Sequence, residues 1–248
     1  MTGDGRYLYC VTEATDSSFG KIGLEQKDAF GVVHKDIAAV VSAIPFKTIE
    51  SGLDTILVHQ RVVEAVRATA TTLPVRFGVI FKNEDGVREM LAKSYPSSRK
   101  KLTELKGKEE YGAKVILDEA GLKRIRGEIE KESDEVGKLK KAATKAGKGA
   151  SYLLKIRMDE ALNNETAKRI DDMSRAVHKE LSQAAIESAL LKSEHEQIIL
   201  NAAYLVEDSQ RDRFQAEAQK VKRSYGKEGL SVHLSGPWAP YSFCQVRD

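Results

Sequence analysis

One segment constrains the fold more than any other, the run LPVRFGVIF at residues 73–81. Its odd-numbered residues, from Leu73 to Phe81, are all large and apolar, which is the period of two expected of a strand with one buried face. Arg76 and Gly78 share the other face, where a glycine permits close approach by another backbone. No general base stands beside them in the sequence, so the segment favours contact with a partner over chemistry.

The overall composition is that of a globular protein with nearly balanced charge. Of the 248 residues, 41% are hydrophobic and 31% are charged, and a chain of this length buries a sizeable core. Its 40 basic and 37 acidic side chains leave a net charge of only +3. Because dedicated nucleic-acid binders carry a stronger basic excess, we expect no nucleic-acid partner.

Cysteine content and hydropathy point to a soluble, cytoplasmic protein. Cys10 and Cys244 are too few for a disulfide framework or a zinc site made mainly of cysteines, so two partly buried thiols are expected. The longest apolar run, at 37–44, is far shorter than the ~20 residues of a membrane span. The first six residues contain no apolar signal region.

Residues 1–108 are expected to form an N-terminal α+β domain. Strands are expected at 7–11, 30–33, 37–44 and 73–81, and helices at 54–70 and 84–94. The run 37–44 is apolar on both faces, as in a central strand, and 30–33 pairs with it through a short turn. Pro96 is expected to end the second helix.

Residues 109–248 are expected to form the second α+β domain, after a boundary in the charged stretch 106–110. A strand at 113–117 is followed by a charged helical arm at about 119–196, and then by a strand at 198–206, a helix at 209–225 and a strand at 230–234. Two helices that fold back on each other at Gly147 would bury both apolar stripes of the arm. A charged helix that packs on its own domain is the alternative.

The residues offer no catalytic, metal-binding or cofactor-binding constellation. The histidines are scattered and lack metal-ligand spacing, and the stretch GKGAS at 147–151 lacks the glycine and hydroxyl positions of a phosphate loop. His59 is the strongest exception, because it precedes the Arg76 segment on a predicted helix. A hydrogen bond that fixes this helix to the sheet is its expected role.

Three other residues are candidates for contact with a partner. Asn201 interrupts an otherwise apolar strand, and a buried amide must find a hydrogen-bond partner, either in a neighbouring turn or in another chain. Trp238 and Tyr241 lie in a turn made rigid by two prolines, where aromatic side chains serve either as interface anchors or as core.

Five segments that span nearly the whole chain, in this order, resemble the gas vesicle protein F/L family. They are YLY at 7–9, LPVRFG at 73–78 with His59 ahead of it, GASYLL at 149–154, NAAYLV at 201–206 and GPWAPYSF at 236–243. The compact length is closer to the F type.

The resemblance implies a non-enzymatic accessory or minor structural protein of gas vesicle formation, without cofactors and located in the cytoplasm and at the gas vesicle. It implies two α+β domains, the second a modified ferredoxin-like fold. It also implies association with the small apolar shell protein and with other accessory proteins, early in shell assembly.

The residues expected to contact the shell protein are Arg76, Phe77, Gly78, Asn201, Tyr204, Trp238 and Tyr241. A soluble partner of this kind would cover apolar shell surface or offer a sheet edge to it. One alternative is a small-molecule enzyme on a ferredoxin-like sheet, with His59 as base and Arg76 as anion clamp. A coiled-coil scaffold unrelated to vesicles is another.

Overall fold

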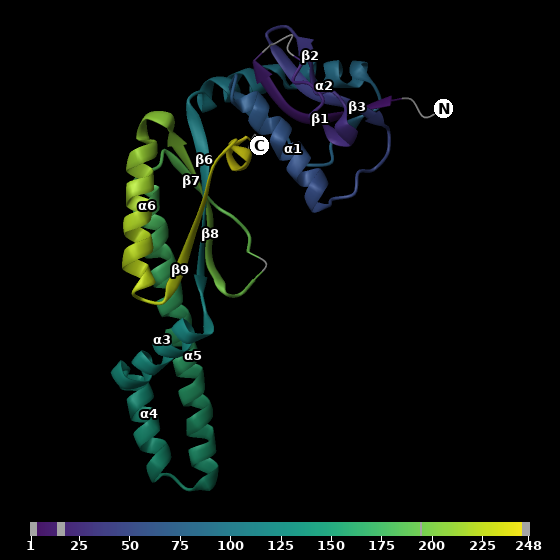
Figure 1. The fold of residues 1–248 in the computed structure, drawn as a ribbon. Coiled ribbons are helices and arrows are strands. Elements are labelled where there is room, and N and C mark those ends of the chain that lie inside the picture. The colour runs from purple at the N-terminus through teal and green to yellow at the C-terminus, as the bar shows by residue number, and fades with distance from the viewer. Residues whose placement is uncertain (1–3, 14–17, 194, 245–248) are drawn as a thin grey trace. The chain divides into compact units, whose positions relative to one another are not determined.

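The structure, a computed structural model, describes residues 4–13, 18–193 and 195–244, and its elements are labelled in Figure 1. Contacts divide the chain into two compact units. Unit 1 comprises Met1–Tyr111, Leu205–Asp208 and Gly236–Asp248, and unit 2 comprises Gly112–Tyr204 and Ser209–Ser235. The division into domains 1–108 and 109–248 stays a prediction.

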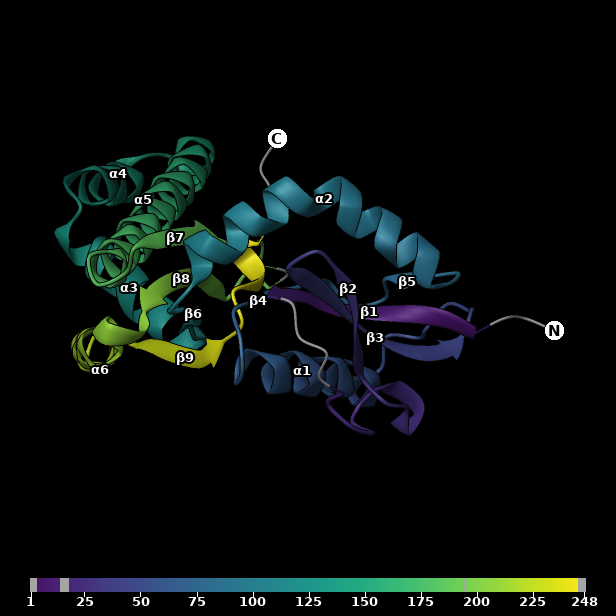
Figure 2. The same cartoon turned by 90° about the horizontal axis from the view of Figure 1, so that it is seen from above.

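Unit 1 is built on a five-stranded antiparallel sheet between two helices. Its strands are β1 (Asp4–Glu13), β2 (Phe30–His34), β3 (Ile37–Pro45), β4 (Thr72–Pro74) and β5 (Ile80–Phe81). They follow the order β2-β3-β1-β4, with β5 also paired to β1. Figure 2 shows α1 (Leu53–Arg67) and α2 (Glu84–Leu105) on opposite faces of this sheet.

The central position predicted for residues 37–44 is confirmed. Every residue of β3 from Ile37 to Ser42 is buried, because β1 and β2 flank the strand and helices cover both faces. The hairpin that joins β2 to β3 pairs His34 with Ile37, so the predicted partner strand is also confirmed.

Pro96 does not end α2, so that prediction was wrong. The helix continues to Leu105 because side chains on both sides of the proline are buried along one stripe. These are Val87, Leu91, Ser98, Leu102 and Leu105. Burial of this stripe outweighs the backbone hydrogen bond that the proline removes.

The second sheet has four strands in the order β7-β8-β6-β9. The strands are β6 (Lys108–Leu117), β7 (Glu187–Leu190), β8 (Ile198–Glu207) and β9 (Leu230–Trp238). The main helices of unit 2 are α3 (Glu119–Glu132), α4 (Asp134–Lys145), α5 (Lys148–Ser182) and α6 (Arg211–Gly226). Short 3₁₀ turns lie at Leu24–Gln26, Asp208–Gln210 and Tyr241–Phe243.

The predicted α+β class is confirmed by these helices and sheets. Along the chain, β6, the helices α3 to α5, β7, β8, α6 and β9 follow the β-α-β-β-α-β order of the split βαβ motif. The finer assignment to a modified ferredoxin-like fold stays a prediction. The stripe of α6, made of Phe214, Ala218, Val221 and Tyr225, is buried.

The predicted helical arm exists, but it ends earlier than expected. Its chain breaks at Gly147, and α4 packs beside the first half of α5, beyond the end of the sheet (Figure 1). The extent to residue 196 was wrong, because α5 ends at Ser182 and β7 follows. Pairing with β8, which continues in a hydrogen bond from Leu191 N–H to the Asn201 carbonyl at 2.8 Å, outweighs local helix preference.

Candidate protein-interaction site

The segment after β4 leaves the sheet and returns to it as β5. Cys10 of β1 pairs with Pro74, and Tyr7 of β1 pairs with Ile80. Between these two pairs β1 advances by three residues, whereas the segment from Pro74 to Ile80 advances by six. Val75 N–H donates to the Tyr9 carbonyl at 2.9 Å, and Leu8 N–H donates to the Val79 carbonyl at 2.9 Å. The residues between these bonds, 76–78, therefore form a bulge, which we call the Arg76 bulge.

The continuous strand predicted for residues 73–81 was therefore wrong. Gly78 has a φ of +95°, in the left-handed region that side chains other than glycine adopt only with strain. A Cβ atom there would meet no heavy atom within 4 Å, so the glycine serves the turn and not a close approach. The predicted alternation of burial holds only at 75–79, where Val75, Phe77 and Val79 are half-buried and Arg76 and Gly78 are exposed. Pro74 and Ile80 were expected on the exposed face, but Pro74 is buried and Ile80 is half-buried.

A chain of hydrogen bonds holds the Arg76 bulge on the scaffold. His59 Nε2 lies 2.9 Å from the Val75 carbonyl, which can only accept, so this nitrogen carries the proton. In the neutral ring, Nδ1 accepts from the Tyr7 hydroxyl at 2.9 Å. The Tyr7 oxygen in turn accepts the Gly78 N–H at 3.1 Å. The predicted role of His59, to fix the helix to the sheet, is confirmed.

Burial sets the protonation of this hydrogen-bonded chain. It lowers the pKa of His59 below its ordinary value of 6.5, although the bond to the Val75 carbonyl opposes the shift. Burial also raises the pKa of Tyr7 to about 12, although the hydrogen bond from Gly78 N–H opposes this shift. Both groups are therefore neutral at pH 7, as the hydrogen-bond directions require.

Aromatic rings pack around the same two side chains. The Phe77 ring lies edge-on to Tyr7 and His59, with centroids 5.9 Å from each. The centroid of the Tyr9 ring lies 4.9 Å from that of Tyr7 and 5.5 Å from that of His59. Edge-to-face pairs of this kind fix ring orientation, so Phe77 is placed by the core although it is only half-buried.

A pocket of about 360 Å³ opens over this cluster. It brings together four of the predicted contact residues, Arg76, Phe77, Trp238 and Tyr241. The remaining lining residues are Ile56, His59, Gln60 and Glu110. We call it the Arg76–Trp238 pocket.

Two carboxylates hold the C-terminal wall of the pocket. Glu110 accepts the Ser242 N–H at 2.7 Å and the Ser242 hydroxyl at 2.8 Å, and Glu64 accepts the Ala239 N–H at 3.1 Å. Burial raises the pKa of Glu110, while the Ser242 hydrogen bonds oppose this shift. Gly236 has a φ of +114°, and a Cβ there would lie 2.8 Å from the Glu110 carbonyl, so only glycine fits this approach.

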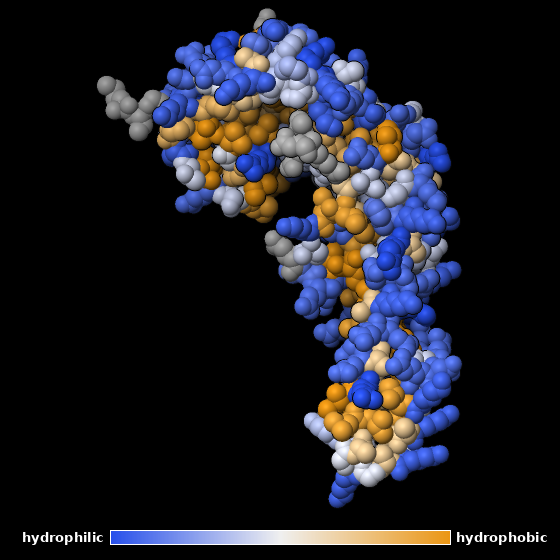
Figure 3. Space-filling view, turned by 180° about the vertical axis from the view of Figure 1, so that it is seen from behind, coloured by the Kyte–Doolittle hydropathy of each residue, from blue (hydrophilic) through white to orange (hydrophobic). Residues whose placement is uncertain are grey.

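An exposed apolar row on α1 continues the pocket outward. Leu53, Ile56 and Leu57 lie on one face of the helix and are 74%, 43% and 48% exposed, and Ile56 also lines the pocket. Figure 3 shows an apolar area on unit 1, at the upper left of that view. This row was not predicted, although its signal is present in the sequence as apolar residues of the helix that lie outside the Val62 stripe.

The pocket contains the three groups that the enzyme alternative requires, His59, Arg76 and a carboxylate, here Glu110. Both ring nitrogens of His59 are hydrogen-bonded, however, and each oxygen of Glu110 is bonded to Ser242. A general base needs an available lone pair that faces the substrate. The positions of these three residues fit the enzyme alternative, but the hydrogen bonds of His59 and Glu110 do not fit a general base.

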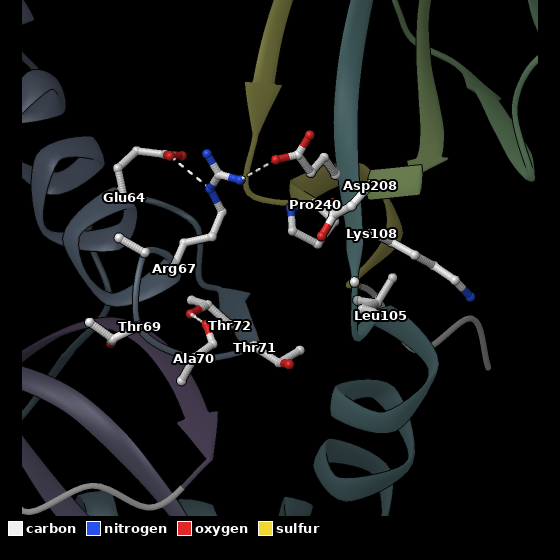
Figure 4. Close-up of a pocket in the computed structure, with 13 residues that line it drawn as sticks. Glu64, Arg67, Thr69, Ala70, Thr71, Thr72, Leu105, Lys108, Asp208 and Pro240 are labelled. Atoms are coloured by element: carbon white, nitrogen blue, oxygen red, sulfur yellow. Dashed lines mark hydrogen bonds and ion pairs between the residues drawn. The ribbon is translucent and has the colours of Figure 1, made fainter. Parts of the chain in front are cut away.

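A second pocket of unit 1, of about 420 Å³, is a polar structural notch (Figure 4). Arg67 Nε lies 2.8 Å from Glu64, and its Nη1 lies 3.0 Å from Glu109. Burial disfavours the charged guanidinium, but these carboxylates more than compensate and raise the pKa of Arg67. Lys108 points away from the pocket and donates to the Glu104 carbonyl (Figure 4). Since the charge of Arg67 is already matched, the notch is poorly suited to an anionic ligand.

Asn201 and Tyr204, the other predicted contact residues, lie in unit 2. Tyr204 is fully buried, with its hydroxyl 2.9 Å from His178 Nδ1 and its ring against Phe214, so it packs the core. Asn201 Nδ2 donates to the Lys192 carbonyl at 2.8 Å. Both residues thus have structural partners within unit 2.

The two thiols are free, with Cys10 buried and Cys244 half-buried, as predicted. Burial raises the pKa of both thiols, that of Cys244 to about 12, so neither is a reactive thiolate at pH 7. Within the part of the chain that the structure describes, no three histidine, cysteine or carboxylate side chains come together as a metal site would need. None of the helices formed by the described residues combines the length and apolar content needed to cross a bilayer.

Residues 5–245 match the family described as "Gas vesicle synthesis protein GvpL/GvpF". Gas vesicle protein L of a Streptomyces strain is 24% identical, over 98% of this chain and 94% of the relative. Gas vesicle protein F of Haloferax mediterranei is 26% identical, also over 98% of this chain and 94% of the relative.

Two solved structures share the fold. The gas vesicle protein GvpF of Anabaena sp. PCC7120 matches with a TM-score of 0.84 at 21% identity, over 99% of this chain and 100% of that one. GvpF of Microcystis aeruginosa matches with a TM-score of 0.78 at 18% identity, over 98% and 99% of the two chains.

Replacement of Gly78 tests the geometry of the bulge. Because its φ is +95°, Gly78→Ala should lower the free energy of unfolding by about 1–2 kcal/mol. The matched control is Gly137→Ala in α4, where a Cβ would meet no heavy atom within 4 Å and alanine should be neutral or stabilising by up to about 1 kcal/mol. Urea denaturation measures both, and an equal response of the two variants would contradict the assigned turn.

Stability should also depend on pH through His59. Its pKa is lower in the folded state than the ordinary 6.5, so its contribution is complete above that pH and is lost as the pH falls to the folded-state pKa. Urea midpoints at about pH 7.5 and about pH 5 should therefore differ less in His59→Gln than in the unmodified chain. His233→Gln, at an exposed position of β9, is the control and should keep the full difference.

Proposed function

The chain belongs to the GvpL/GvpF family of gas vesicle synthesis proteins, and from this premise we propose that it binds the apolar shell protein and assists early shell assembly. Membership of this family, which the sequence motifs indicated, implies a role in gas vesicle formation. The family is one of gas vesicle structural and accessory proteins and is not a known enzyme family. The preference for the F type over the L type stays a prediction, since relatives of both names match.

The observation that carries the proposal is the Arg76–Trp238 pocket with its apolar rim. Aromatic side chains form the pocket, and the exposed row of α1 extends it. Buried aromatic and arginine side chains in a desolvated hollow are the usual anchors of protein interfaces. A large apolar side chain of a shell subunit would fill the hollow, while neighbouring apolar surface would lie against Leu53 and Leu57.

Arg76 gives this site a charge preference. It is exposed, and among the described residues none forms an ion pair with it. A guanidinium at the edge of an apolar hollow would pair with a carboxylate beside the inserted side chain. The site therefore suits an apolar segment with an acidic residue close to its anchor.

A sheet edge is the other mode by which a shell strand could dock. The edge strand β2 is only five residues long, and the Arg88 guanidinium donates to its Val33 carbonyl at 2.8 Å. Because this short edge is partly capped and offers few free backbone groups, the pocket is a better supported site than the β2 edge. Other gas vesicle accessory proteins are further proposed partners, in the cytoplasm and at the vesicle.

Removal of the pocket anchors tests this function. Arg76→Ala, Trp238→Ala and Leu53→Ser should each weaken binding to purified shell protein by about tenfold or more, because each removes an anchor or rim contact. Arg61→Ala on α1 and Leu190→Ser on β7, both exposed and outside the pocket, are the controls. Co-purification and a binding titration measure the effect. Undiminished binding in variants with unchanged circular dichroism would remove the pocket from the proposal.

Deletion of the arm separates this function from the scaffold alternative. A coiled-coil scaffold would lose every partner when residues 134–160 are removed, whereas the pocket lies wholly in unit 1 and should still bind the shell protein.

A further inference from the structure

The end of the α4–α5 arm carries a concentrated positive charge. Between residues 138 and 157 there are seven basic side chains and no acidic one, namely Lys138, Lys140, Lys141, Lys145, Lys148, Lys155 and Arg157. The net charge of the whole chain is only +3, so the remaining residues are acidic by four charges. The end of the arm, residues 138–157, is therefore opposite in charge to the rest of the chain.

Large apolar side chains are exposed in the middle of this basic region. Tyr152 and Leu153 are 66% and 62% exposed, and Ile156 is 39% exposed. At 3.6 residues per turn, these three lie on one side of α5, and the half-buried Leu154 and Met158 lie on the other. Figure 3 shows an apolar area near the far end of the arm, with paler surface below it and hydrophilic surface at its sides.

The charges flank this apolar face in a regular way. By the same helical spacing, Lys148 and Lys155 border it on one side and Arg157 on the other. Asp159 and Glu160 follow one turn later on the same face and end the apolar row. The result is a short apolar stripe with basic edges on the outer side of a helical hairpin.

We propose that this stripe is a second interaction surface, which binds an amphipathic helix with acidic edges from a partner protein. Two antiparallel helices readily accept a third along their side, and an apolar stripe of about one and a half turns suits anchors spaced three and four residues apart. Glutamate or aspartate at the edges of the partner stripe would face Lys148, Lys155 and Arg157. The surface is separate from the Arg76–Trp238 pocket and does not rest on the function proposed for it.

The position of the apolar side chains favours a helix over a lipid surface. The turn of the hairpin contains Lys145, Ala146, Gly147 and Lys148, so the tip has no large apolar side chain to insert into a bilayer. The apolar stripe lies along the flank instead, and an anionic bilayer laid against it would meet Asp159 and Glu160. Nucleic acid is disfavoured because the centre of the surface is aliphatic and not basic.

Photo-crosslinking in cells that contain the gas vesicle proteins tests the proposal. The full-length chain would carry benzoylphenylalanine in place of Leu153, with the exposed α6 position Lys222 as control. The expected product is a protein adduct at position 153 only, attached to a helix whose apolar stripe is flanked by acidic residues. Lys148→Glu with Lys155→Glu should reduce the adduct at least tenfold, and Lys222→Glu with Lys227→Glu should leave it unchanged.

A charge exchange makes the test decisive. When the acidic residues of the partner are replaced by lysine, the adduct should form again with the chain that carries Lys148→Glu and Lys155→Glu. Trp238→Ala should leave the adduct of the otherwise unmodified chain unchanged. The proposal would be overturned by equal adducts at positions 153 and 222, or by adducts to lipid or nucleic acid. It would also be overturned if charge reversal, in a chain with unchanged helix content, did not change the adduct. Since shell binding is measured separately with Trp238→Ala, failure of one surface is distinguishable from failure of the other.

Discussion

Unit 1 depends on one chain of hydrogen bonds, from Gly78 N–H through Tyr7 and His59 to the Val75 carbonyl. Its members come from β1, α1 and the Arg76 bulge, which are far apart in sequence. With a neutral imidazole every donor meets an acceptor, so the buried network is fully satisfied and rigid. The bulge is therefore fixed in place, and the positions of Arg76 and Phe77 follow from a core they do not belong to.

The opposite wall of the pocket is fixed by the same kind of interaction. Glu64 and Glu110 accept hydrogen bonds from backbone and hydroxyl groups of residues 239–242, and Glu64 also pairs with Arg67. The carboxylates that organise the pocket are thus already hydrogen-bonded to the scaffold. The aromatic faces and Arg76 are left for contact, which makes the site preorganised for binding and poorly equipped for proton transfer.

Local patterns in the sequence predicted those helices and strands that are determined by neighbouring residues of the chain. The apolar run of β3 and the α6 stripe were found because burial follows a fixed period, and the arm because Gly147 interrupts two charged helices. The bulge was missed because alternation reports which side is buried and not whether the backbone stays in register. Continuation of α2 through Pro96, the edge strand β7 and the pocket itself all depend on residues distant in sequence, which a local pattern does not contain.

Net charge does not report the basic region at the end of the arm for a related reason, since it averages over a chain whose charges are unevenly distributed. α5 is about 50 Å long at 1.5 Å per residue, and charges in water are screened beyond about 8–10 Å at physiological ionic strength. The lysines at one end of such a helix are therefore felt by a nearby partner without cancellation from acidic residues elsewhere in the chain. A nearly neutral protein can in this way present a strongly basic surface, and a partner that approaches the end of the arm meets this local charge and not the average.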